Sequence, residues 1–360
     1  MQAAVLHGVG DKALDVRDDV ELVGEVGPTD VKVKLHAAGV CHSDLSAMSG
    51  ILPVMPPSVL GHEGSGEIVE VGSLVTDVAE GDRVIVCWTP PCGKCRYCRF
   101  GQPNLCTTML MQSMGQPRYR YEGTDAFAFL GVATFSEVSV MAQEAVVKVP
   151  DDVPYDILSL LGCGVMTGVG AAINSARIEP ASSVAVIGCG GVGISAIQGA
   201  RIAGASEIVA VDALEGKLEA SKRFGATKVA TPDTLQEVSQ EVTGGEGFDY
   251  VLECVGKSVT IRSAFDATRR GGTTVVVGAG SNEEKVEFSA FELFFSEKRL
   301  MGSYYGGADV RRDYDRLLAL WRTGRLDLES MITARLKLEE VNEGFEALSQ
   351  PGTIRQVIEF

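Results

Sequence analysis

The sequence predicts an α/β protein of two domains, in which a doubly wound parallel sheet is joined to an antiparallel, barrel-like β domain. A length of 360 residues suits two domains. The first 150 residues hold short alternating strands, such as 31–40, 65–72 and 83–88, broken by Gly, Pro and Asp. From about residue 165, apolar strands, glycine turns and helical segments alternate, as in a parallel sheet covered by helices.

The order of the predicted elements indicates where the chain passes between the domains. Strands and helices of the parallel sheet are expected, in order, over 183–188, a segment reaching Ala203, 207–212, 215–224, 228–230 and 234–242. An amphipathic helix over 309–324 precedes the strand-like ending IRQVIEF, whose pattern resembles the first domain. We therefore assign residues 1–164 and 305–360 to one domain, and residues 165–304 to the other.

Composition and charge indicate which classes of partner the protein is poorly suited to bind and in which compartment we expect it. The net charge of −16, with no basic cluster, makes nucleic acid and anionic membranes poor partners. Two uncharged runs, 157–176 and 180–200, have the length of membrane spans but hold many glycines, so we interpret them as buried core. The N-terminus lacks the basic and apolar regions of a signal peptide, and we expect a cytoplasmic protein.

A glycine turn predicts a dinucleotide site. Residues 188–193, Gly-Cys-Gly-Gly-Val-Gly, follow an apolar strand and open a helix, which would place a pyrophosphate at the helix N-terminus. Asp212 ends the next strand, where a carboxylate binds the adenosine ribose and repels a 2′-phosphate, so we expect NAD. The alternative is a turn that only packs the helix on the strand. The expected coenzyme contacts in the turn are Gly188, Gly190, Gly191, Val192 and Gly193.

Four cysteines in one loop predict a structural zinc site in a lobe of about residues 88–110. Their spacing is C-x2-C-x2-C-x7-C, with prolines on both sides, and four thiolates close a tetrahedron that leaves no open position. Four free thiols would be an oxidation hazard, and an iron–sulfur cluster is the stronger rival. The predicted ligands are Cys92, Cys95, Cys98 and Cys106.

Three scattered residues form a second candidate metal site. Cys41, His62 and Cys163 would supply two thiolates and one imidazole, which leaves the fourth tetrahedral position open for water or substrate, as catalytic zinc requires. Asp44 could orient the His62 ring, and Glu63 would place another carboxylate beside the metal. The other cysteines are interpreted as small buried hydrophobic residues: Cys87, Cys189 and Cys254.

Several motifs occur together in a family order that spans essentially the whole chain. They are GVCHSD, PSVLGHEGSGEIVEVG, the four-cysteine lobe, LLGCGVMTG, VIGCGGVG, VDALEGK and IRQVIEF. With them the sequence resembles the zinc-dependent medium-chain alcohol dehydrogenase family. The resemblance implies a GroES-like β-barrel catalytic domain, a Rossmann coenzyme domain and two Zn²⁺ ions per subunit. It also implies reversible hydride transfer from a primary or secondary alcohol to NAD, and a homodimer, with a tetramer left open.

The resemblance also assigns roles to individual residues. Ser43 corresponds to the hydroxyl that takes the alcohol proton, whereas Ser46 stands where many members have histidine, so we expect a slower or differently pH-dependent proton relay. Coenzyme contacts are implied as follows: His42 and Arg355 at the pyrophosphate, Asp212 and Lys217 at the ribose, and Thr167, Val255 and Val277 in the rest of the site.

The substrate and the exact activity remain open at this point. The stretch GCGVMTGVGAAIN is similar to enzymes that oxidise S-hydroxymethyl adducts of glutathione or mycothiol. A nicotinoprotein with permanently bound NAD and a non-catalytic zinc protein are further alternatives. Apolar or aromatic positions that would line a pocket for a medium-chain or aromatic alcohol, unless they are simply core, are Leu110, Met111, Met114, Phe291, Phe294 and Tyr304.

Overall fold

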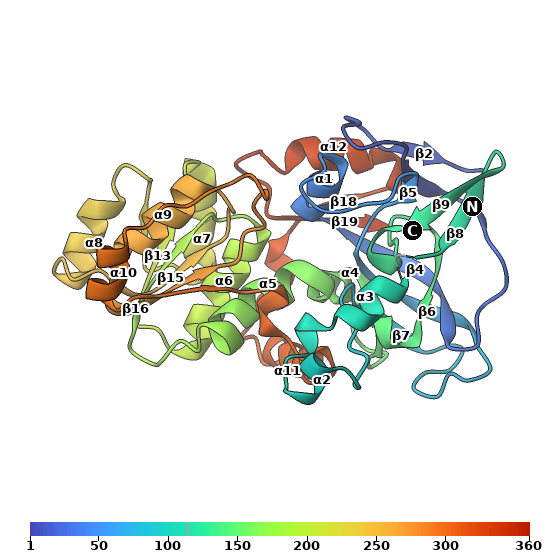
Figure 1. Cartoon of the computed structure of the whole chain (residues 1–360), viewed down its shortest axis with the longest axis horizontal. Coiled ribbons are helices and arrows are strands. Elements are labelled where there is room, and N and C mark those ends of the chain that lie inside the picture. Colours follow the sequence, from blue (N-terminus) through green and yellow to red (C-terminus); the bar gives the residue numbers. More distant parts are fainter. Residues whose placement is uncertain (114) are drawn as a thin grey trace.

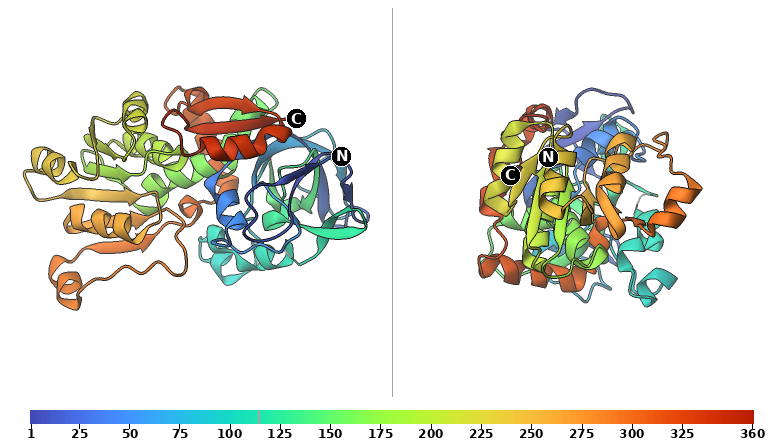
Figure 2. Two further views of the ribbon diagram at one scale, coloured as in Figure 1. Left: turned by 90° about the horizontal axis from the view of Figure 1, so that it is seen from above. Right: turned by 90° about the vertical axis from the view of Figure 1, so that its left-hand side faces the viewer.

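The computed structural model describes residues 1–113 and 115–360, except for the side chains of Leu110, Gln112 and Ser113. Two bodies lie side by side along the long axis of the molecule (Figure 1). A parallel sheet with its helices forms one body, and a β-rich body forms the other. In Figure 2 the C-terminal segment, drawn in red, lies over the β-rich body near the junction.

The parallel sheet confirms the predicted doubly wound fold. Its strand order is β14-β13-β12-β15-β16-β17, and all neighbouring strands run parallel, as in dinucleotide-binding folds. The order reverses beside β12, so the loops that follow β12 and β15 meet where such folds bind ligands. The strands are β12 (Ser183–Ile187), β13 (Glu207–Val211), β14 (Lys228–Ala230), β15 (Phe248–Glu253), β16 (Thr268–Val276) and β17 (Arg299–Gly302).

Helices connect these strands, at positions close to those predicted. Gly204 (φ 91°) and Gly225 (φ 119°) end α6 and α7 in the left-handed conformation, which glycine adopts without steric cost. The helices are α6 (Gly191–Ala203), α7 (Glu215–Phe224), α8 (Leu235–Thr243), α9 (Ser258–Ala267) and α10 (Ala290–Ser296).

The β-rich body consists of two sheets, which the hydrogen bonds of the described residues leave open. One has the order β2-β1-β5-β9-β8-β3, with strands β1 (Ala3–Leu6), β2 (Asp15–Arg17), β3 (Glu21–Leu22), β5 (Ser58–Val59), β8 (Pro117–Tyr121) and β9 (Thr124–Ala128). The other has the order β11-β7-β6-β4-β19-β18, and β10 pairs with β4. Its strands are β4 (Asp30–Val40), β6 (Glu63–Val71), β7 (Arg83–Val86), β10 (Val138–Ala142), β11 (Val146–Lys148), β18 (Ile332–Leu336) and β19 (Arg355–Glu359).

The C-terminal segment returns to the first domain, as predicted. Strand β19 runs antiparallel to β4, with Val357 opposite Gly39. Two helices, α11 (Val310–Arg322) and α12 (Val341–Ala347), precede it. Short 3-10 turns complete the chain: η1 (Pro103–Leu105), η2 (Phe129–Gly131), η3 (Gln143–Ala145), η6 (Tyr305–Gly307), η7 (Glu329–Met331) and η8 (Leu338–Glu340).

One long apolar helix, Tyr155–Ser175, passes between the two bodies. By length and composition it could span a membrane, but 83% of its most apolar window is buried inside the chain, which confirms its interpretation as core. The expected domain boundary at 164/165 falls within this helix. Two π-helical turns interrupt it, so its parts are α4 (Tyr155–Leu160), η4 (Leu161–Val165), α5 (Met166–Gly170) and η5 (Ala171–Ser175).

Candidate active site and metal centres

The three scattered ligands predicted from the sequence meet at one buried point. Cys41 precedes α1 (His42–Met48), His62 precedes β6, and Cys163 lies in the π-helical turn η4. One donor atom from each, together with a carboxylate oxygen of Glu63, lies within 4.8 Å of all the others. None of these four residues is more than 5% exposed. The fold therefore assembles this group from elements far apart in the chain.

The His62 ring is oriented so that one nitrogen remains free. Its Nδ1 lies 3.1 Å from Asp44 Oδ1, and that oxygen also accepts a hydrogen bond from Gly61 N. Nε2 of His62 is buried without a partner, although a buried ring nitrogen normally has one. Burial alone would lower the pKa of His62, but the Asp44 carboxylate outweighs it and raises that pKa well above the usual range. Asp44 thus contacts the ring through Nδ1, its orienting role stays a prediction, and a neutral ring held in this way would offer Nε2 to a metal.

The donor set at this point fits a zinc ion. The hydrogen bond between the two thiols lowers the pKa of Cys41 well below its usual range and raises that of Cys163. Two sulfur atoms and one unpaired imidazole nitrogen are ligands that zinc prefers, and the set leaves a fourth position for substrate. The Ser43 hydroxyl lies 3.7 Å from Cys41 Sγ, next to the group. A hydroxyl group therefore lies beside the candidate metal site, and its predicted role in proton transfer stays a prediction.

Glu63 is fully buried beside the candidate zinc ligands. Its Oε1 accepts a hydrogen bond from Gly164 N at 2.7 Å, and its Oε2 pairs with the buried Arg355 guanidinium. Burial raises the pKa of Glu63 to about 7, although Arg355 opposes the shift. Glu63 therefore ties β6 to the turn that carries Cys163, and through Arg355 to strand β19.

The four-cysteine lobe has the geometry of a closed metal site. Sulfur–sulfur distances are 3.6 Å for Cys95–Cys98, 3.9 Å for Cys95–Cys106 and 4.0 Å for Cys92–Cys98. A tetrahedron with Zn–S bonds of about 2.3 Å has sulfur atoms about 3.8 Å apart. Burial would raise the pKa of the Cys92 thiol. The backbone N–H groups of Lys94 and Cys95 point at Cys92 Sγ and outweigh this effect, so the pKa is lowered to about 6. The lobe also includes α2 (Arg96–Arg99) and α3 (Thr107–Ser113).

The glycine turn is built for close backbone approach. Gly188 has φ 92°, and a Cβ at Gly193 would lie only 1.7 Å from the Gly188 carbonyl oxygen. Gly190 and Val192 lie at the first turn of α6, whose free N–H groups would face a pyrophosphate. A Cβ at Gly191 would lie 2.3 Å from Arg355 Cδ, so Arg355 reaches the turn as well as Glu63. Its predicted contact with the pyrophosphate stays a prediction.

Asp212 closes the turn from the neighbouring strand. Its Oδ2 accepts from Cys189 N at 2.8 Å and its Oδ1 from Leu214 N at 2.9 Å. Lys217 Nζ lies 3.4 Å from Leu348 O, which joins α7 to the segment before β19. These positions agree with a ribose site at the end of β13.

Four further coenzyme residues were predicted. His42 and Val255 are exposed, Thr167 is buried on α5, and Val277 is half-buried after β16.

Comparisons with known proteins identify the family. Residues 27–151 match the model of the alcohol dehydrogenase GroES-like domain, and residues 191–322 match that of the zinc-binding dehydrogenase domain. A curated protein of Synechocystis sp., named S-(hydroxymethyl)glutathione dehydrogenase, is 37% identical, and the match covers 100% of this chain and 99% of that protein. The chain belongs to the zinc-dependent medium-chain dehydrogenase family.

Solved structures agree with this assignment. Benzyl alcohol dehydrogenase from Acinetobacter calcoaceticus has a TM-score of 0.91 and 31% identity, covering 100% of this chain and 99% of its own. Acetophenone reductase from Geotrichum candidum, solved with NAD, has a TM-score of 0.79 and 28% identity, covering 100% and 97%. This dehydrogenase is therefore an oxidoreductase that uses NAD and zinc, and a non-catalytic zinc protein is not supported.

Aromatic side chains surround the candidate catalytic site of the dehydrogenase. The rings of Trp88 and Phe129 stand edge-on to His62, at centroid distances of 6.3 and 6.0 Å. Tyr304 contacts Trp88 at 5.3 Å, and Asn104 Nδ2 donates to Tyr304 O at 2.9 Å. The sequence alone singled out Tyr304 but missed Trp88 and Phe129. In the sequence, Trp88 is marked only by its position next to the lobe, and Phe129 only by its position in an apolar segment.

The prediction that Phe291 and Phe294 line their own subunit's pocket was wrong. Both lie on α10, which Figure 1 places at the end of the Rossmann domain away from the β-rich body. They are 69% and 79% exposed, because α10 packs on β16 through its other face. Met111 is also exposed, on the lobe. Two further predicted positions, the Leu110 side chain and Met114, lie outside the described residues.

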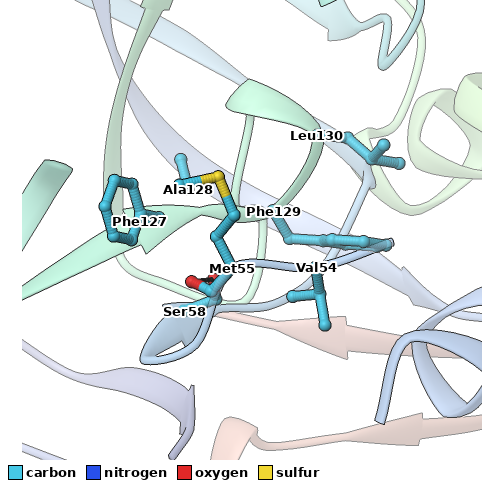
Figure 3. A pocket seen from close by; sticks show the side chains of 7 residues that line it. All are labelled: Val54, Met55, Ser58, Phe127, Ala128, Phe129 and Leu130. Atoms are coloured by element: carbon cyan, nitrogen blue, oxygen red, sulfur yellow. Dashed lines mark hydrogen bonds between the residues drawn. The ribbon is translucent and has the colours of Figure 1, made fainter. Parts of the chain in front are cut away.

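A small pocket lies behind Phe129, away from the ligand atoms. Figure 3 shows the loop with Val54 and Met55 facing the turn that carries Phe129 and Leu130. Its volume of about 10 Å³ holds roughly one water molecule. This pocket is too small for an alcohol substrate, and its apolar walls back the aromatic ring that touches His62.

Proposed function

We propose that this dehydrogenase oxidises an apolar, preferably aromatic, alcohol with NAD and carries out the reverse reduction. The observation that carries the proposal is the absence of charged side chains from four segments near the aromatic side chains beside His62. The charged groups at the ligands themselves, Asp44, Glu63 and Arg355, are in contrast buried and paired. Residues 45–61, 104–117, 126–136 and 301–308 contain no Asp, Glu, Lys, Arg or His.

Phe129 in the third segment contacts His62, and Tyr304 in the fourth contacts Trp88, which also contacts His62. The second segment is joined to Tyr304 by Asn104, and the first lines a small pocket with Phe129. Such a site favours an uncharged ring over a charged substrate, because nothing replaces the hydration of the charge.

Each residue of the site has a separate role in the proposed reaction. Cys41, His62 and Cys163 would hold the zinc ion, with Asp44 orienting His62. The chemistry supplied by the bound groups is Lewis-acid polarisation of the alcohol oxygen by zinc and acceptance of hydride by the nicotinamide. Ser43 Oγ, 3.7 Å from Cys41 Sγ, would accept the proton that the alcohol releases while its own hydroxyl proton passes on toward the coenzyme ribose. The aromatic side chains would exclude water and orient the carbon that loses hydride.

A second candidate is a thiol-dependent formaldehyde dehydrogenase. The support is the 37% identity, over essentially full length, to a protein named S-(hydroxymethyl)glutathione dehydrogenase. Glutathione carries two carboxylates and an ammonium group, and mycothiol carries several hydroxyl groups. The four segments offer hydroxyl and amide groups but no charged side chain that could pair with the charges of a glutathione adduct. We therefore rank this activity second.

A screen of NAD reduction separates the candidates. Benzyl alcohol is expected to give a kcat/KM at least about tenfold above that of ethanol, since burying the ring contributes more than burying a methyl group. Formaldehyde with glutathione or with mycothiol is the matched comparison. A thiol adduct turned over faster than every simple alcohol would overturn the proposal. NAD that stays with the protein through dialysis would instead indicate a nicotinoprotein.

We also propose a homodimer joined through the Rossmann domains. Within the described part of the chain, strand β17 ends the parallel sheet with one edge unpaired, and Leu300 and Met301 on it are 39% and 37% exposed. Beside it, α10 exposes Phe291 and Phe294. Exposed apolar edges promote association, and a second copy would cover this one by extending the sheet. A tetramer would need a further surface.

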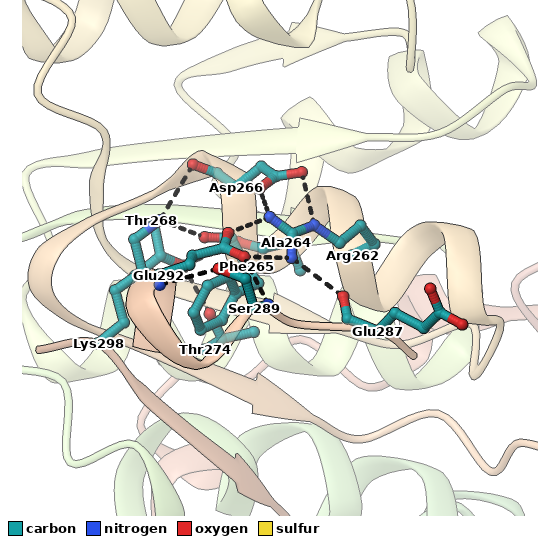
Figure 4. Close-up of polar contacts among 10 residues, drawn as sticks. All are labelled: Arg262, Ala264, Phe265, Asp266, Thr268, Thr274, Glu287, Ser289, Glu292 and Lys298. Carbon is teal, nitrogen blue, oxygen red and sulfur yellow. Dashed lines mark hydrogen bonds and ion pairs between the residues drawn. The ribbon is translucent and has the colours of Figure 1, made fainter. Parts of the chain in front are cut away.

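The helix beside this edge is held firmly in place. Figure 4 shows Arg262 on α9 reaching Asp266 on its own helix and Glu292 on α10. Ser289 caps α10 through a hydrogen bond from Glu292 N, and Lys298 Nζ donates to Phe265 O at 2.6 Å. These contacts join α10 to α9, while the aromatic side chains Phe291 and Phe294 remain exposed.

Solution size tests the dimer. Light scattering should give twice the chain mass for the natural protein and a monomer for Leu300→Lys, which places a charge on the edge. Thr273→Ser, on the covered neighbouring strand, is the matched control and should remain a dimer. A monomeric natural protein would contradict the proposal.

We place the enzyme in the cytoplasm because reduced thiols suit its two cysteine sites.

A further inference from the structure

The turn that carries Cys163 is fixed from outside the helix on both sides of that residue. This turn, Leu161–Val165, is π-helical, a geometry that occurs often at functional sites. The peptide N–H after Cys163, at Gly164, donates to Glu63 Oε1 at 2.7 Å. The peptide carbonyl before it, at Gly162, accepts from the Tyr305 hydroxyl at 2.6 Å. Both peptide groups that flank the thiol are therefore anchored by side chains of other elements.

The direction of the hydrogen bonds behind this turn follows from proton counting. A carbonyl oxygen can only accept, so Tyr305 gives its single hydroxyl proton to Gly162 O. The Tyr314 hydroxyl, 2.8 Å from that of Tyr305, must then donate to it. Tyr305 is 2% exposed and Tyr314 fully buried, among apolar core residues. Burial also raises the pKa of the adjacent Cys87 thiol to about 12, so Cys87 stays protonated. The result is a short chain of donors that ends on the Gly162 carbonyl.

The backbone of Tyr305 has a conformation that residues with a Cβ rarely adopt. Its φ of 53° lies in the left-handed region, which costs free energy for any residue with a Cβ. Gly306 and Gly307 follow in the same region. A Cβ at Gly306 would lie 2.4 Å from Met166 O and 2.9 Å from the Gly170 Cα. The turn η6 is therefore pressed against α5, and this contact places the phenol beneath Gly162.

Packing alone does not require the hydroxyl groups. The Tyr305 ring stands 4.8 Å from the Trp88 ring, a contact that phenylalanine would make equally well. A buried hydroxyl, in contrast, must find a partner, and here the partner is the peptide group before a candidate zinc ligand. Outer groups that orient the ligands of a metal affect its affinity without touching it.

We propose that Tyr305, supported by Tyr314, is a positioning residue that holds Cys163 in the geometry needed to bind the catalytic zinc ion. The inference rests on the proposed function, in which Cys163 is a ligand of that ion. It gives the tyrosine pair a role at the metal although neither phenol belongs to the ligand set. Among the described residues, none of the four lobe cysteines contacts this pair, so a zinc ion bound in the lobe provides an internal reference.

The test compares Tyr305→Phe with Tyr314→Phe in the full-length enzyme loaded with zinc. Release of each zinc ion to a chelator is followed by a colorimetric indicator and by metal analysis. Tyr305→Phe should release the catalytic zinc about tenfold faster and leave the lobe zinc unchanged. Tyr314→Phe keeps the bond to Gly162, so its release should accelerate only about twofold to threefold. In the cobalt(II)-substituted enzyme, the thiolate charge-transfer band should shift in Tyr305→Phe, and NAD affinity should not change.

Two outcomes would overturn the inference. In the first, Tyr305→Phe releases both zinc ions faster to the same extent, which is general destabilisation. In the second, release and the cobalt spectrum are unchanged. If Tyr305→Phe does not fold, the twofold to threefold effect of Tyr314→Phe decides alone. A natural enzyme that binds only the lobe zinc would instead refute the proposed ligand set, and this result is distinguishable because it precedes any substitution.

Discussion

The two cysteine-containing sites of this dehydrogenase use the same chemistry but are built in different ways. The lobe ligands lie within residues 92–106, and three of the four are partly exposed. The catalytic ligands are spread over residues 41–163, and all are buried. The lobe is thus a local loop around a metal, whereas the catalytic site exists only when the long helix, β6 and α1 have come together.

The groups that support the ligands differ in the same way. In the lobe, neighbouring backbone N–H groups point at Cys92 Sγ. At the catalytic site the support comes from side chains of other elements, with Asp44 on His62 and Glu63 on the turn of Cys163. A closed site with local support suits stability, and an open site with long-range support suits chemistry. Substitutions should separate these two roles.

The largest effect is expected for Cys41→Ala. Loss of one of three ligands should remove the catalytic zinc and reduce alcohol oxidation to the background, because no other group polarises the alcohol oxygen. NAD affinity, measured by fluorescence titration, should stay close to that of the natural enzyme, and the lobe should keep its zinc. Full turnover in this variant would show that the ligand assignment is wrong.

Ser43→Ala should have the next largest effect. Removing the hydroxyl that we propose to relay the alcohol proton is expected to lower kcat about 100-fold at neutral pH, within the usual range for a lost acid–base group. Both zinc ions should remain, since Ser43 is not a ligand. Steady-state kinetics and metal analysis together check this, and Ser43→Thr, which keeps the hydroxyl, is the matched control. Equal rates for the alanine variant and the natural enzyme would remove Ser43 from the mechanism.

The paired change Asp212→Ala and Leu214→Arg should alter coenzyme choice without touching either zinc site. It removes the carboxylate that repels a 2′-phosphate and adds a cation, so the ratio of kcat/KM for NADP to that for NAD should rise about 100-fold. Asp212→Ala alone controls for the loss of the hydrogen bonds that Asp212 accepts from Cys189 N and Leu214 N. An unchanged preference for NAD would mean that the ribose site lies elsewhere.

Cys106→Ser should affect catalysis least and folding most. The lobe should lose its zinc, and the midpoint of thermal unfolding should fall, because structural zinc contributes folding free energy directly. Activity per folded chain should fall by less than about threefold, since the catalytic ligands are held by other elements. Calorimetry and active-site titration measure the two quantities. A loss of activity as complete as that of Cys41→Ala would mean that the two sites are not independent.

The same comparison explains what the sequence could and could not predict. The four lobe cysteines and the glycine turn were predictable because local spacing alone determines their geometry. The strands over 31–40 and 183–188 were predictable from periodicity, and the β19 return from its pattern. Cys41, His62 and Cys163 were proposed together from their residue types and their acidic neighbours, and the family resemblance supported that choice, because nothing in their spacing shows that they meet.

Contacts between distant elements could not be predicted. Trp88 and Phe129 meet His62 only through the packing of separate loops. The π-helical turn at Cys163 and the left-handed Tyr305 depend on that packing rather than on residue propensities. Phe291 was expected in a pocket because apolar residues are usually covered, yet α10 exposes it at the free edge of the sheet.

Metal analysis of the natural enzyme and the two cysteine variants tests the central claim most directly. The account predicts two zinc ions per chain in the natural enzyme, one for each cysteine-containing group. It predicts one in Cys41→Ala, without NADH formation from benzyl alcohol, and one in Cys106→Ser, with NADH formation retained. Iron in place of zinc, or zinc at only one site of the natural enzyme, would contradict it.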